Sequence, residues 1–582
     1  MRRTKIVCTI GPSIETEEKI TKVIEAGMDV ARLNLSHGSR KDHYSRLELI
    51  RSVSEKSRKN VGFLFDTRGP EVRTGELGET SYILEDGQNF ILTTEQVIGD
   101  NLKVGVTYPD LHLDLKPGNK VLIDDGLLVL KVLEISGREI LCRVIHGGEL
   151  KSYKGLNTPE TRINLPALGS EDSVDIKMAL ENEVDFLAAS FTRSSEDILE
   201  IRKLVEEKCG NIMILAKIES REGVENFDTI LEVADGIMVA RGDLGVEIPP
   251  EEVPLLQKEF ITKCNRLGKP VITATQMLDS MIRNPQPTRA EASDVANAIF
   301  DGTDAVMLSG ETAVGRYPIE TVETMNRIAM HTEGGLDYKN ILEESGLTSK
   351  RTVTDAISYA TCHIAHELGA NAIITATQSG HTARMVSKYR PRAPIVAVTS
   401  RRKVASQLAL TWGVHSIICP PVSSTDNMFD NAVRTSLAEG LVADGDLVII
   451  TAGVPVGVSG TTNLLRVETV GEIIVQGTGV GKLSASGKAF VAKKESELEN
   501  FEEGMILVAP MTNNHYLPSI EKAAALVTEE GGLTSHGAIV AINLGIPAIV
   551  GADKAAAKIK TGEMITVDAT RGLIYRGEAN VL

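Results

Sequence analysis

Charged residues recur at alternate positions where apolar runs of the sequence end. Lys217 and Glu219 follow the run ILA, and Arg241 and Asp243 follow the run MVA. Side chains at positions i and i+2 of a strand lie on the same face, so each pair is predicted to share a face. Two carboxylates supply oxygen ligands for a hard divalent cation, while lysine and arginine neutralise phosphoryl oxygens. This combination predicts phosphoryl-transfer chemistry.

Further polar residues alternate in the same way in other apolar runs. Arg32, Asn34 and Ser36 do so in DVARLNLSHG, and Thr273 and Thr275 do so in PVITATQML. For any single pair, a structural ion pair is an equal alternative. Polar groups at most strand ends together favour a shared charged ligand, because buried charges are costly without one. The stretch GTGVGKLS is read as a turn rather than a phosphate loop, since leucine follows its lysine.

A repeating βα pattern is predicted to position these residues. Apolar, β-branched runs alternate with amphipathic segments of helical length. Eight such runs match a TIM barrel, whose active sites lie at the carboxyl ends of the strands. The predicted strands are residues 5–11, 29–38, 61–69, 184–191, 212–220, 236–245, 270–278 and 304–313.

Three further regions interrupt or follow this pattern. Residues 70–165 carry turn signals between short apolar runs, which predicts a small β-barrel lid. Short strands at 372–377, 394–399, 415–419 and 447–453 predict a second, open α/β sheet. The predicted fold is therefore α/β, with a catalytic (β/α)8 barrel at 1–69 and 166–345, an inserted lid at 70–165, an α/β domain at 346–472 and an extra C-terminal domain at 473–582.

Composition narrows the function classes. The chain has 582 residues and a formal charge of −17, which argues against general nucleic-acid binding. Its six cysteines are scattered without CxxC spacing, so a reducing compartment fits better than a disulfide framework. No apolar run reaches the roughly 18–20 residues that span a bilayer. We expect a cytoplasmic protein with no membrane and no nucleic-acid partner.

Six ordered motifs together resemble the pyruvate kinase family, over residues 4 to about 472. The resemblance implies transfer of the phosphoryl group of phosphoenolpyruvate to ADP in glycolysis, with phosphoenolpyruvate and ADP/ATP as ligands and a homotetramer as the assembly. A catalytically silent metabolite-binding protein is less well supported, because the predicted catalytic residues are all present. The motifs are ARLNLSHG, FDTRGPEVRTG, ILAKIES, VARGDLGVEIP, TATQMLDSM and DGTDAVMLSGETAVGRYP.

The resemblance implies a role for individual residues of these motifs. Three catalytic residues are implied. Lys217 is expected to stabilise the phosphoryl group during transfer, Arg32 to hold phosphates of the nucleotide or the transferring group, and Thr275, or water near it, to relay a proton to the enolate. The implied substrate-binding residues are Arg32, Lys217, Gly242, Asp243 and Thr275, the nucleotide-binding residues are Asn34, His37 and Arg73, and the ligands of Mg2+ (or Mn2+) are Glu219 and Asp243.

A monovalent cation is implied as well. The family's K+ ligands match Asn34, Ser36, Asp66 and the Thr67 carbonyl, and Glu71 matches members that require this ion. One departure concerns the nucleotide: Glu171 occupies a position where relatives commonly have a lysine that reaches toward phosphate. Glu171 is therefore not among the predicted nucleotide-binding residues.

A loop of the α/β domain is predicted to bind a phosphorylated effector. The stretch TQSGHTAR follows a predicted strand and begins a helix, where amides and hydroxyls can hold phosphate. Ordinary helix capping is the alternative. Residues 453–463 and the basic run at 401–403 favour an anion site. The resemblance implies AMP, ribose 5-phosphate or fructose 1,6-bisphosphate, with contacts from Thr377, Ser379, Gly380, His381 and Thr382.

The last 110 residues or so resemble the swivelling phosphohistidine domain of pyruvate, phosphate dikinase, as in bacillus-type pyruvate kinases. The similarity lies in EEGGLTSHGAIVAINLGIPAIVG, which contains His536. A phosphohistidine phosphotransferase is therefore the alternative function. A structural role is favoured, because the dikinase motif continues Ala-Arg where this chain has Ala541 and Ile542. Thr534, Ser535 and His536 can instead cap the helix.

Overall fold

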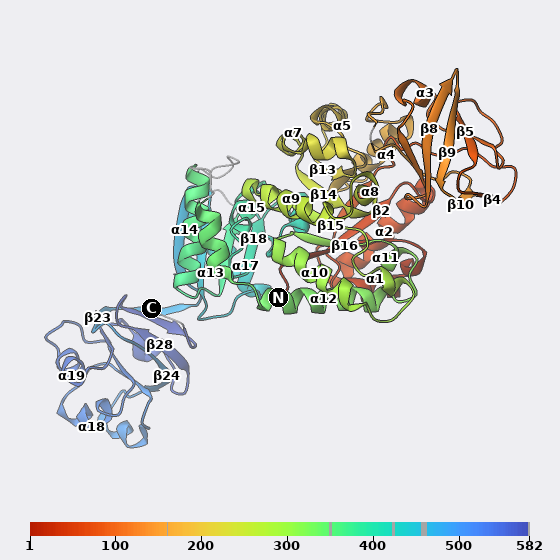
Figure 1. The fold of residues 1–582 in the computed structure, drawn as a ribbon. Helices are drawn as coiled ribbons and strands as arrows, with labels where there is room; N and C mark the ends of the chain where they lie inside the picture. Colours follow the sequence, from red (N-terminus) through yellow and green to blue (C-terminus); the bar gives the residue numbers. More distant parts are fainter. Residues whose placement is uncertain (160, 348–351, 422–424, 455–461, 580–582) are drawn as a thin grey trace. The chain divides into compact units, whose positions relative to one another are not determined.

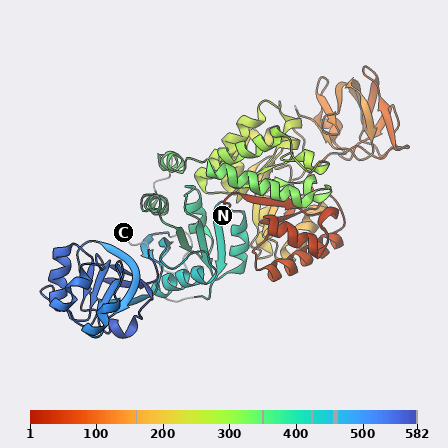
Figure 2. The ribbon, with the colours of Figure 1, turned by 90° about the horizontal axis from the view of Figure 1, so that it is seen from below.

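The computed structural model describes the chain except for residues 160, 348–351, 422–424, 455–461 and 580–582. It has two compact units (Figures 1 and 2). One unit is Met1–Asp337 with Arg401–Ser416, and the other is Tyr338–Ser400 with Ile417–Leu582. Across the residues described, no helix has both the length and the apolar character needed to cross a membrane.

Eight strands close into a barrel in the first unit, as the sequence predicts. Each neighbouring pair is parallel, and the ring runs in the order β1-β16-β15-β14-β13-β12-β3-β2. The strands are β1 (Lys5–Thr9), β2 (Val30–Asn34), β3 (Gly62–Asp66), β12 (Phe186–Ala189), β13 (Met213–Ile218), β14 (Gly236–Ala240), β15 (Val271–Ala274) and β16 (Ala305–Leu308).

Helices lie outside these strands (Figure 2). Their ends follow local sequence: Thr288 and Glu291 form a capping box at the start of α10, and Gly302 ends it with φ 96°. The helices are α1 (Glu17–Ala26), α2 (Arg40–Ser57), α4 (Ser170–Glu181), α5 (Ser195–Glu207), α6 (Arg221–Glu225), α7 (Phe227–Val233), α8 (Arg241–Glu247), α9 (Val253–Leu267), α10 (Arg289–Asp301), α11 (Gly310–Ala313) and α12 (Pro318–Gly334), with short 3-10 turns at Pro12–Ile14 and Asp279–Ile282.

A segment from far along the chain closes the amino-terminal end of the barrel. It contains α16 (Arg402–Gln407) and a 3-10 turn, Leu408–Leu410. Ala409 and Leu410 are buried among inward-facing barrel side chains. Lys5 Nζ donates to the Val414 carbonyl at 2.6 Å. We call Arg401–Ser416 the plug.

The insertion between β3 and β12 is almost entirely β structure (orange in Figure 1). Its strands pair as a six-stranded sheet, β11-β7-β8-β9-β5-β6, and a two-stranded sheet, β10-β4. Its elements are β4 (Ser81–Leu84), β5 (Asn89–Thr93), β6 (Lys103–Gly105), α3 (Leu111–Asp114), β7 (Lys120–Ile123), β8 (Leu128–Ser136), β9 (Glu139–His146), β10 (Gly148–Lys151) and β11 (Leu156–Asn157).

The second unit begins with the predicted open α/β sheet, in the order β19-β18-β17-β20-β21. The four predicted strands are present, and β21 adds an antiparallel edge. The elements are α13 (Tyr338–Leu347), α14 (Val353–Glu367), β17 (Ala372–Ala376), α15 (His381–Ser387), β18 (Ile395–Thr399), β19 (Val414–Ile418), α17 (Thr425–Ala438), β20 (Leu447–Ala452) and β21 (Leu464–Thr469).

The extra C-terminal region forms one eight-stranded sheet in the order β22-β29-β28-β24-β25-β26-β27-β23. Its elements are β22 (Ile473–Gln476), β23 (Thr478–Val480), β24 (Ser484–Val491), β25 (Ile506–Ala509), α18 (Leu517–Ile520), β26 (Ala525–Thr528), α19 (His536–Leu544), β27 (Ala548–Val550), α20 (Ala555–Lys558), β28 (Met564–Asp568) and β29 (Leu573–Arg576), with 3-10 turns at Glu495–Asn500 and Asn514–Tyr516. Two apolar clusters form its core.

Candidate active site at the barrel mouth

Four charged side chains form a continuous buried network at the carboxyl ends of β2, β3 and β13. Arg32 pairs with Asp66 at 2.6 Å, and its Nη1 donates to Thr9 Oγ1 at 2.7 Å. Lys217 Nζ lies 3.0 Å from the other Asp66 oxygen and 2.9 Å from Glu219 Oε1. The structure thus brings together residues that the sequence places up to 187 positions apart.

The charges of this network shift one another's pKa values. Burial opposes the ionisation of Asp66, but Lys217 and Arg32 hold its pKa below the usual value. Burial raises the pKa of Glu219 to about 7, against the attraction of Lys217 and with a contribution from Asp243. Burial also raises the pKa of Asp243. The protein's own positive charges therefore do not fully compensate the negative charges of Glu219 and Asp243. This is expected of carboxylates that bind a cation.

Ser190 is a residue of this network that the sequence reasoning did not single out. Lys217 Nζ donates to Ser190 Oγ at 2.8 Å, and that hydroxyl lies 3.0 Å from Asp66 Oδ1. The next residue, Phe191, donates its amide N–H to Glu219 Oε2 at 2.6 Å. The available signal was that Ser190 ends the apolar run VDFLAAS at a barrel strand, where active-site residues gather.

The predicted strand faces are wrong for Arg241 with Asp243 and for Thr273 with Thr275. Strand β14 ends at Ala240 and α8 begins at Arg241, so Arg241 and Asp243 lie on a helix. Strand β15 ends at Ala274, and Thr275 has φ 65°. The first turn of helix α8 positions Arg241 and Asp243, and the turn after β15 positions Thr275.

The start of α8 and the turn after β15 nevertheless bring Gly242 and Thr275 together. The Gly242 amide donates to Thr275 Oγ1 at 2.8 Å. Arg241 Nη2 donates to the Thr275 carbonyl at 2.9 Å and so supports its left-handed conformation. A hydroxyl held beside a helix's first amides is a suitable seat for a carboxylate.

The predicted K+ ligands lie on adjacent strand ends. Asn34 of β2 is in register with Asp66 of β3, and Asn34 Oδ1 accepts the Ser36 amide at 3.1 Å. The Thr67 carbonyl accepts the Ser190 hydroxyl at 2.7 Å. All four predicted ligands, Asn34, Ser36, Asp66 and Thr67, offer hard oxygen atoms, which fits an alkali cation in chemistry.

The predicted nucleotide contacts differ in their surroundings. Arg73, in the insertion, donates to Glu71 Oε2 from Nε at 2.9 Å and from Nη2 at 2.6 Å. His37 is exposed, and its carbonyl lies 2.8 Å from a ring nitrogen of His43. Glu171, which replaces the expected lysine, pairs with Arg40 at 2.7 Å, so its charge is balanced within the protein.

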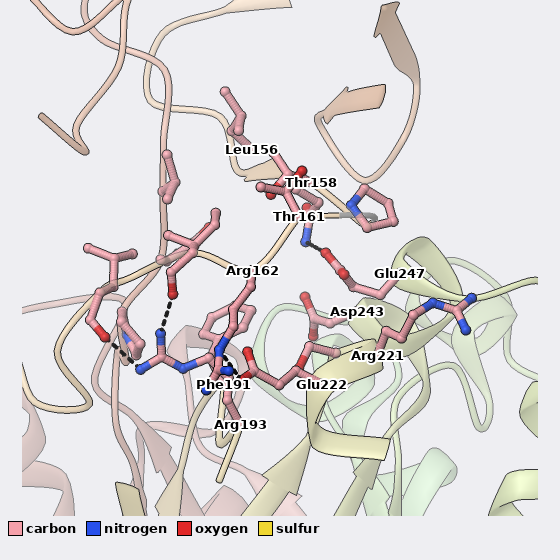
Figure 3. Close-up of a pocket in the computed structure, with 18 of the residues that line it drawn as sticks. Leu156, Thr158, Thr161, Arg162, Phe191, Arg193, Arg221, Glu222, Asp243 and Glu247 are labelled. Atoms are coloured by element: carbon pink, nitrogen blue, oxygen red, sulfur yellow. Dashed lines mark hydrogen bonds and ion pairs between the residues drawn. The ribbon is translucent and has the colours of Figure 1, made fainter. Parts of the chain in front are cut away.

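A pocket of about 410 Å³ lies between the insertion and the barrel loops (Figure 3). Its wall includes Asp243 of the predicted metal site and Glu71. It is also lined by Arg162, Arg193 and Glu222, which the sequence reasoning did not select. Arg162 pairs with Glu222 at 2.8 Å across this pocket.

The predicted effector loop follows β17 in the second unit. Gly380 has φ 76° and precedes α15, which has no side-chain cap among the residues described. Thr382 Oγ1 lies 2.9 Å from Thr462 Oγ1, and Arg384 donates to the Ser379 carbonyl at 3.1 Å. Burial and then Arg384 lower the pKa of His381. Thr377 is buried. Most of the segment 453–463, at 455–461, lies outside the described residues.

His536 begins helix α19 of the extra domain. Its Nδ1 lies 3.1 Å from Thr512 Oγ1. The residue before it, Ser535, is the N-cap and accepts the Ala538 amide at 3.4 Å. The capping predicted for this stretch is thus made by Ser535.

Known proteins resemble the chain over all of these regions. Residues 1–322 match "Pyruvate kinase, barrel domain", residues 355–468 match "Pyruvate kinase, alpha/beta domain", and residues 501–572 match "PEP-utilising enzyme, mobile domain". A solved pyruvate kinase of Cryptosporidium parvum has a TM-score of 0.77 and 39% identity, over 81% of this chain and 96% of that one.

Two bacterial relatives match from end to end. A pyruvate kinase of Bacillus licheniformis is 53% identical over 586 residues, and one of Geobacillus stearothermophilus is 52% identical over 585 residues. Each comparison covers 100% of this chain and 100% of the relative. Since the likeness extends over the barrel, the insertion and the two C-terminal regions alike, the chain belongs to the pyruvate kinase family.

Proposed function

We propose that the buried network of Arg32, Asp66, Lys217 and Glu219 is the catalytic centre of this phosphotransferase, which uses phosphoenolpyruvate and ADP. The observation that carries the proposal is the Lys217 ammonium, held within 3.0 Å of two buried carboxylates at the barrel mouth. A cation fixed in this way stabilises charge on the transferring group without reorganising during the reaction. Arg32 binds phosphoryl oxygens from the side of β2.

Glu219 and Asp243 would hold Mg2+ or Mn2+, with substrate and water completing the shell. When bound, the divalent ion neutralises charge on phosphoryl and carboxylate oxygens. Asn34, Ser36, Asp66 and Thr67 would hold K+. The support for both assignments is the chemistry of the donor atoms, which are oxygens throughout.

The substrate carboxylate would lie at Gly242, Asp243 and Thr275, and Thr275, or water near it, would relay a proton to the enolate carbon. The nucleotide would contact Asn34, His37 and Arg73. Because Glu71 and Arg73 form a two-bond ion pair, ADP phosphates have to compete with Glu71 for this guanidinium.

Several properties of the whole enzyme are proposed with this site. They are a glycolytic role, a homotetramer, allosteric activation through residues 377–382, and the domain boundaries predicted from the sequence. A cytoplasmic location is supported by the six cysteines, all of which are free thiols. Phosphoryl transfer through His536 is the less favoured alternative.

The assignment is tested by Lys217→Met in a steady-state assay of ATP formation. We expect turnover to fall by about 10³-fold or more, while binding of Mn2+ and phosphoenolpyruvate persists, because the lysine charge acts in the transition state. The matched control is Lys151→Met, which removes a half-exposed lysine of the insertion and should leave the rate unchanged. Omitting K+ from the wild-type assay tests the alkali-cation site. A Lys217 variant with a tenth of the wild-type kcat would refute its role.

A further inference from the structure

Arg193 joins the barrel to the segment by which the insertion returns to it. Its Nη1 donates to the Ile163 carbonyl at 3.0 Å, and its Nη2 donates to the Leu165 carbonyl at 2.7 Å (Figure 3). Asp197 Oδ2 lies 3.5 Å from Nε of the same guanidinium. The Arg193 side chain is 16% exposed. This is a fork of charge-assisted hydrogen bonds, sheltered from most of the solvent.

The return segment belongs structurally to the insertion. The side chains of Ile163 and Leu165 pack against the insertion's apolar core. Between them, the Asn164 amide donates to Asp114 at 3.1 Å, and Asp114 also accepts the Tyr108 hydroxyl at 2.8 Å. A displacement of the insertion therefore carries the two carbonyls with it.

On the barrel side, Arg193 is close in sequence to two residues that contact the catalytic network. Arg193 is three residues after Ser190, whose hydroxyl accepts from Lys217, and two after Phe191, whose amide donates to Glu219. Phe191 has φ 52°, a left-handed conformation that a phenylalanine adopts only when its neighbours impose it. The Arg193 carbonyl is itself fixed by Asn226 Nδ2 at 2.9 Å.

We propose that Arg193 is a positioning residue that couples the placement of the insertion over the barrel mouth to the orientation of Glu219. With its fork engaged, the Ser190–Arg193 turn keeps the Phe191 amide aimed at the Glu219 carboxylate. When the insertion moves away, the turn loses this restraint. The catalytic consequence rests on the proposed function, in which Glu219 is a metal ligand.

Arginine suits this position because it presents two parallel donors to two carbonyls, which a lysine ammonium cannot do. A second cation, Arg162, also joins the return segment to the barrel through Glu222, but its side chain is 79% exposed. An ion pair so accessible to water contributes little. Arg162 therefore provides a matched control in the same pocket, with the same charge.

The experiment compares Arg193→Lys, Arg193→Gln and Arg162→Gln in the full-length chain. For both Arg193 variants we expect kcat to fall about tenfold or more and the Mg2+ concentration for half-maximal rate to rise severalfold, with the thermal midpoint of Arg193→Lys close to wild type. Hydrogen exchange at the Phe191 amide should accelerate in the same variants without bound metal or substrate. Arg162→Gln should match wild type in all four measurements.

The Arg193→Lys variant distinguishes the effect of the two parallel donors of arginine from the effect of its positive charge. If Arg193→Lys keeps the wild-type kcat, metal dependence and Phe191 exchange, the proposal is wrong, because charge alone would suffice. An equal loss in Arg162→Gln would also overturn it. Accelerated exchange at Phe191 with an unchanged Mg2+ requirement would confirm the restraint and instead remove Glu219 from the metal site. Should Arg193→Gln fail to fold, Arg193→Lys decides.

Discussion

Glu219 combines a charged function with nearly complete burial, since 1% of its side chain is exposed. Lys217 and the Phe191 amide each satisfy one of its oxygens, yet desolvation still outweighs them and raises its pKa to about 7. In the metal-free protein, keeping the Glu219 carboxylate ionised above neutral pH therefore costs free energy. A divalent cation would remove that cost on binding, which is how one residue can favour both metal uptake and catalysis.

This raised pKa predicts the pH dependence of stability. Between the ordinary glutamate pKa and about 7, the folded protein binds the proton more tightly than the unfolded chain, so the contribution of Glu219 is present at low pH and is lost as pH rises through 7. Without metal, Glu219 should make the free energy of unfolding of the wild-type protein decrease by on the order of 2 kcal/mol between pH 5 and 8. Glu219→Gln should remove this decrease, which urea unfolding at each pH measures.

The matched control for this effect is Glu18→Gln on α1, where 75% of the side chain is exposed. Lys22 holds the pKa of Glu18 below the usual value, so Glu18 titrates outside the tested range. The control should retain the wild-type slope. An identical slope in Glu219→Gln and wild type would contradict the assigned cause.

The plug is the element whose role is least visible in its own sequence. Leu410 is fully buried and Ala409 nearly so, among inward-facing side chains of the barrel strands such as Val7 and Phe186. A barrel interior is a packed core with two open ends, and at the amino-terminal end this segment supplies the missing apolar layer. The catalytic barrel is thus completed by residues that follow it by more than sixty positions.

Leu410→Ala should therefore destabilise the barrel. Removing a buried leucine side chain costs about 2–5 kcal/mol. The single tryptophan of the chain, Trp412, lies in the plug and is buried, so its fluorescence during urea unfolding reports on this segment directly. The control is Leu255→Ala on α9, where the leucine is 73% exposed and the expected change is about 0.5 kcal/mol or less. Equal midpoints for the two variants would contradict the plug's role.

The sequence predicted the presence of secondary-structure elements more accurately than the residues at which they end. All eight barrel strands were located, because each is an apolar run that alternates with a segment of helical length. The errors for Asp243 and Thr275 have one cause: the strands stop before these residues, and helix α8 and the turn after β15 then set the directions of their side chains. A positive φ such as that of Thr275 is imposed by distant contacts, here Arg241, and leaves no local signal. The plug was also not predicted, because the barrel residues that it contacts are far from it in the sequence.

Charge is distributed unevenly over the whole molecule. The chain carries a formal charge of −17, which repels phosphoenolpyruvate and ADP, so cations have to be gathered locally. Arg32 and Lys217 supply positive charge at the barrel mouth, where they pair with Asp66 and Glu219, and Arg384 lies beside the predicted effector loop.

If the loop binds a phosphorylated effector, replacing Ser379 and Thr382 together by alanine should abolish activation. The measured quantity is the KM for phosphoenolpyruvate with and without AMP, ribose 5-phosphate or fructose 1,6-bisphosphate. Wild type should show a lower KM with at least one of them, by a shift between two states of the assembly, and the variant should show none. Activation that survives in the variant would leave the loop as a structural turn.

The extra domain raises the question of whether phosphate passes through His536. A carrier histidine needs a donor, an acceptor and a cation near its phosphate. In helix α19 the residue after Ala541 is Ile542, which is 59% exposed, where the dikinase motif has arginine. The His536 ring instead has Thr512 as a neighbour at 3.1 Å, and Ser535 caps the helix. These contacts suit a histidine that helps to hold a helix terminus.

His536→Ala should accordingly leave kcat within a factor of about two, because the barrel transfers phosphate directly to ADP. Losing the contact with Thr512 should cost the extra domain about 1 kcal/mol, the usual value of a neutral hydrogen bond. Incubation with labelled phosphoenolpyruvate should yield no acid-labile label on the protein. Thr512→Val is the matched variant, since it removes the same hydrogen bond and keeps the imidazole. Label that appears in wild type and in Thr512→Val, but is lost in His536→Ala, would establish His536 as a phosphate carrier and overturn the structural assignment.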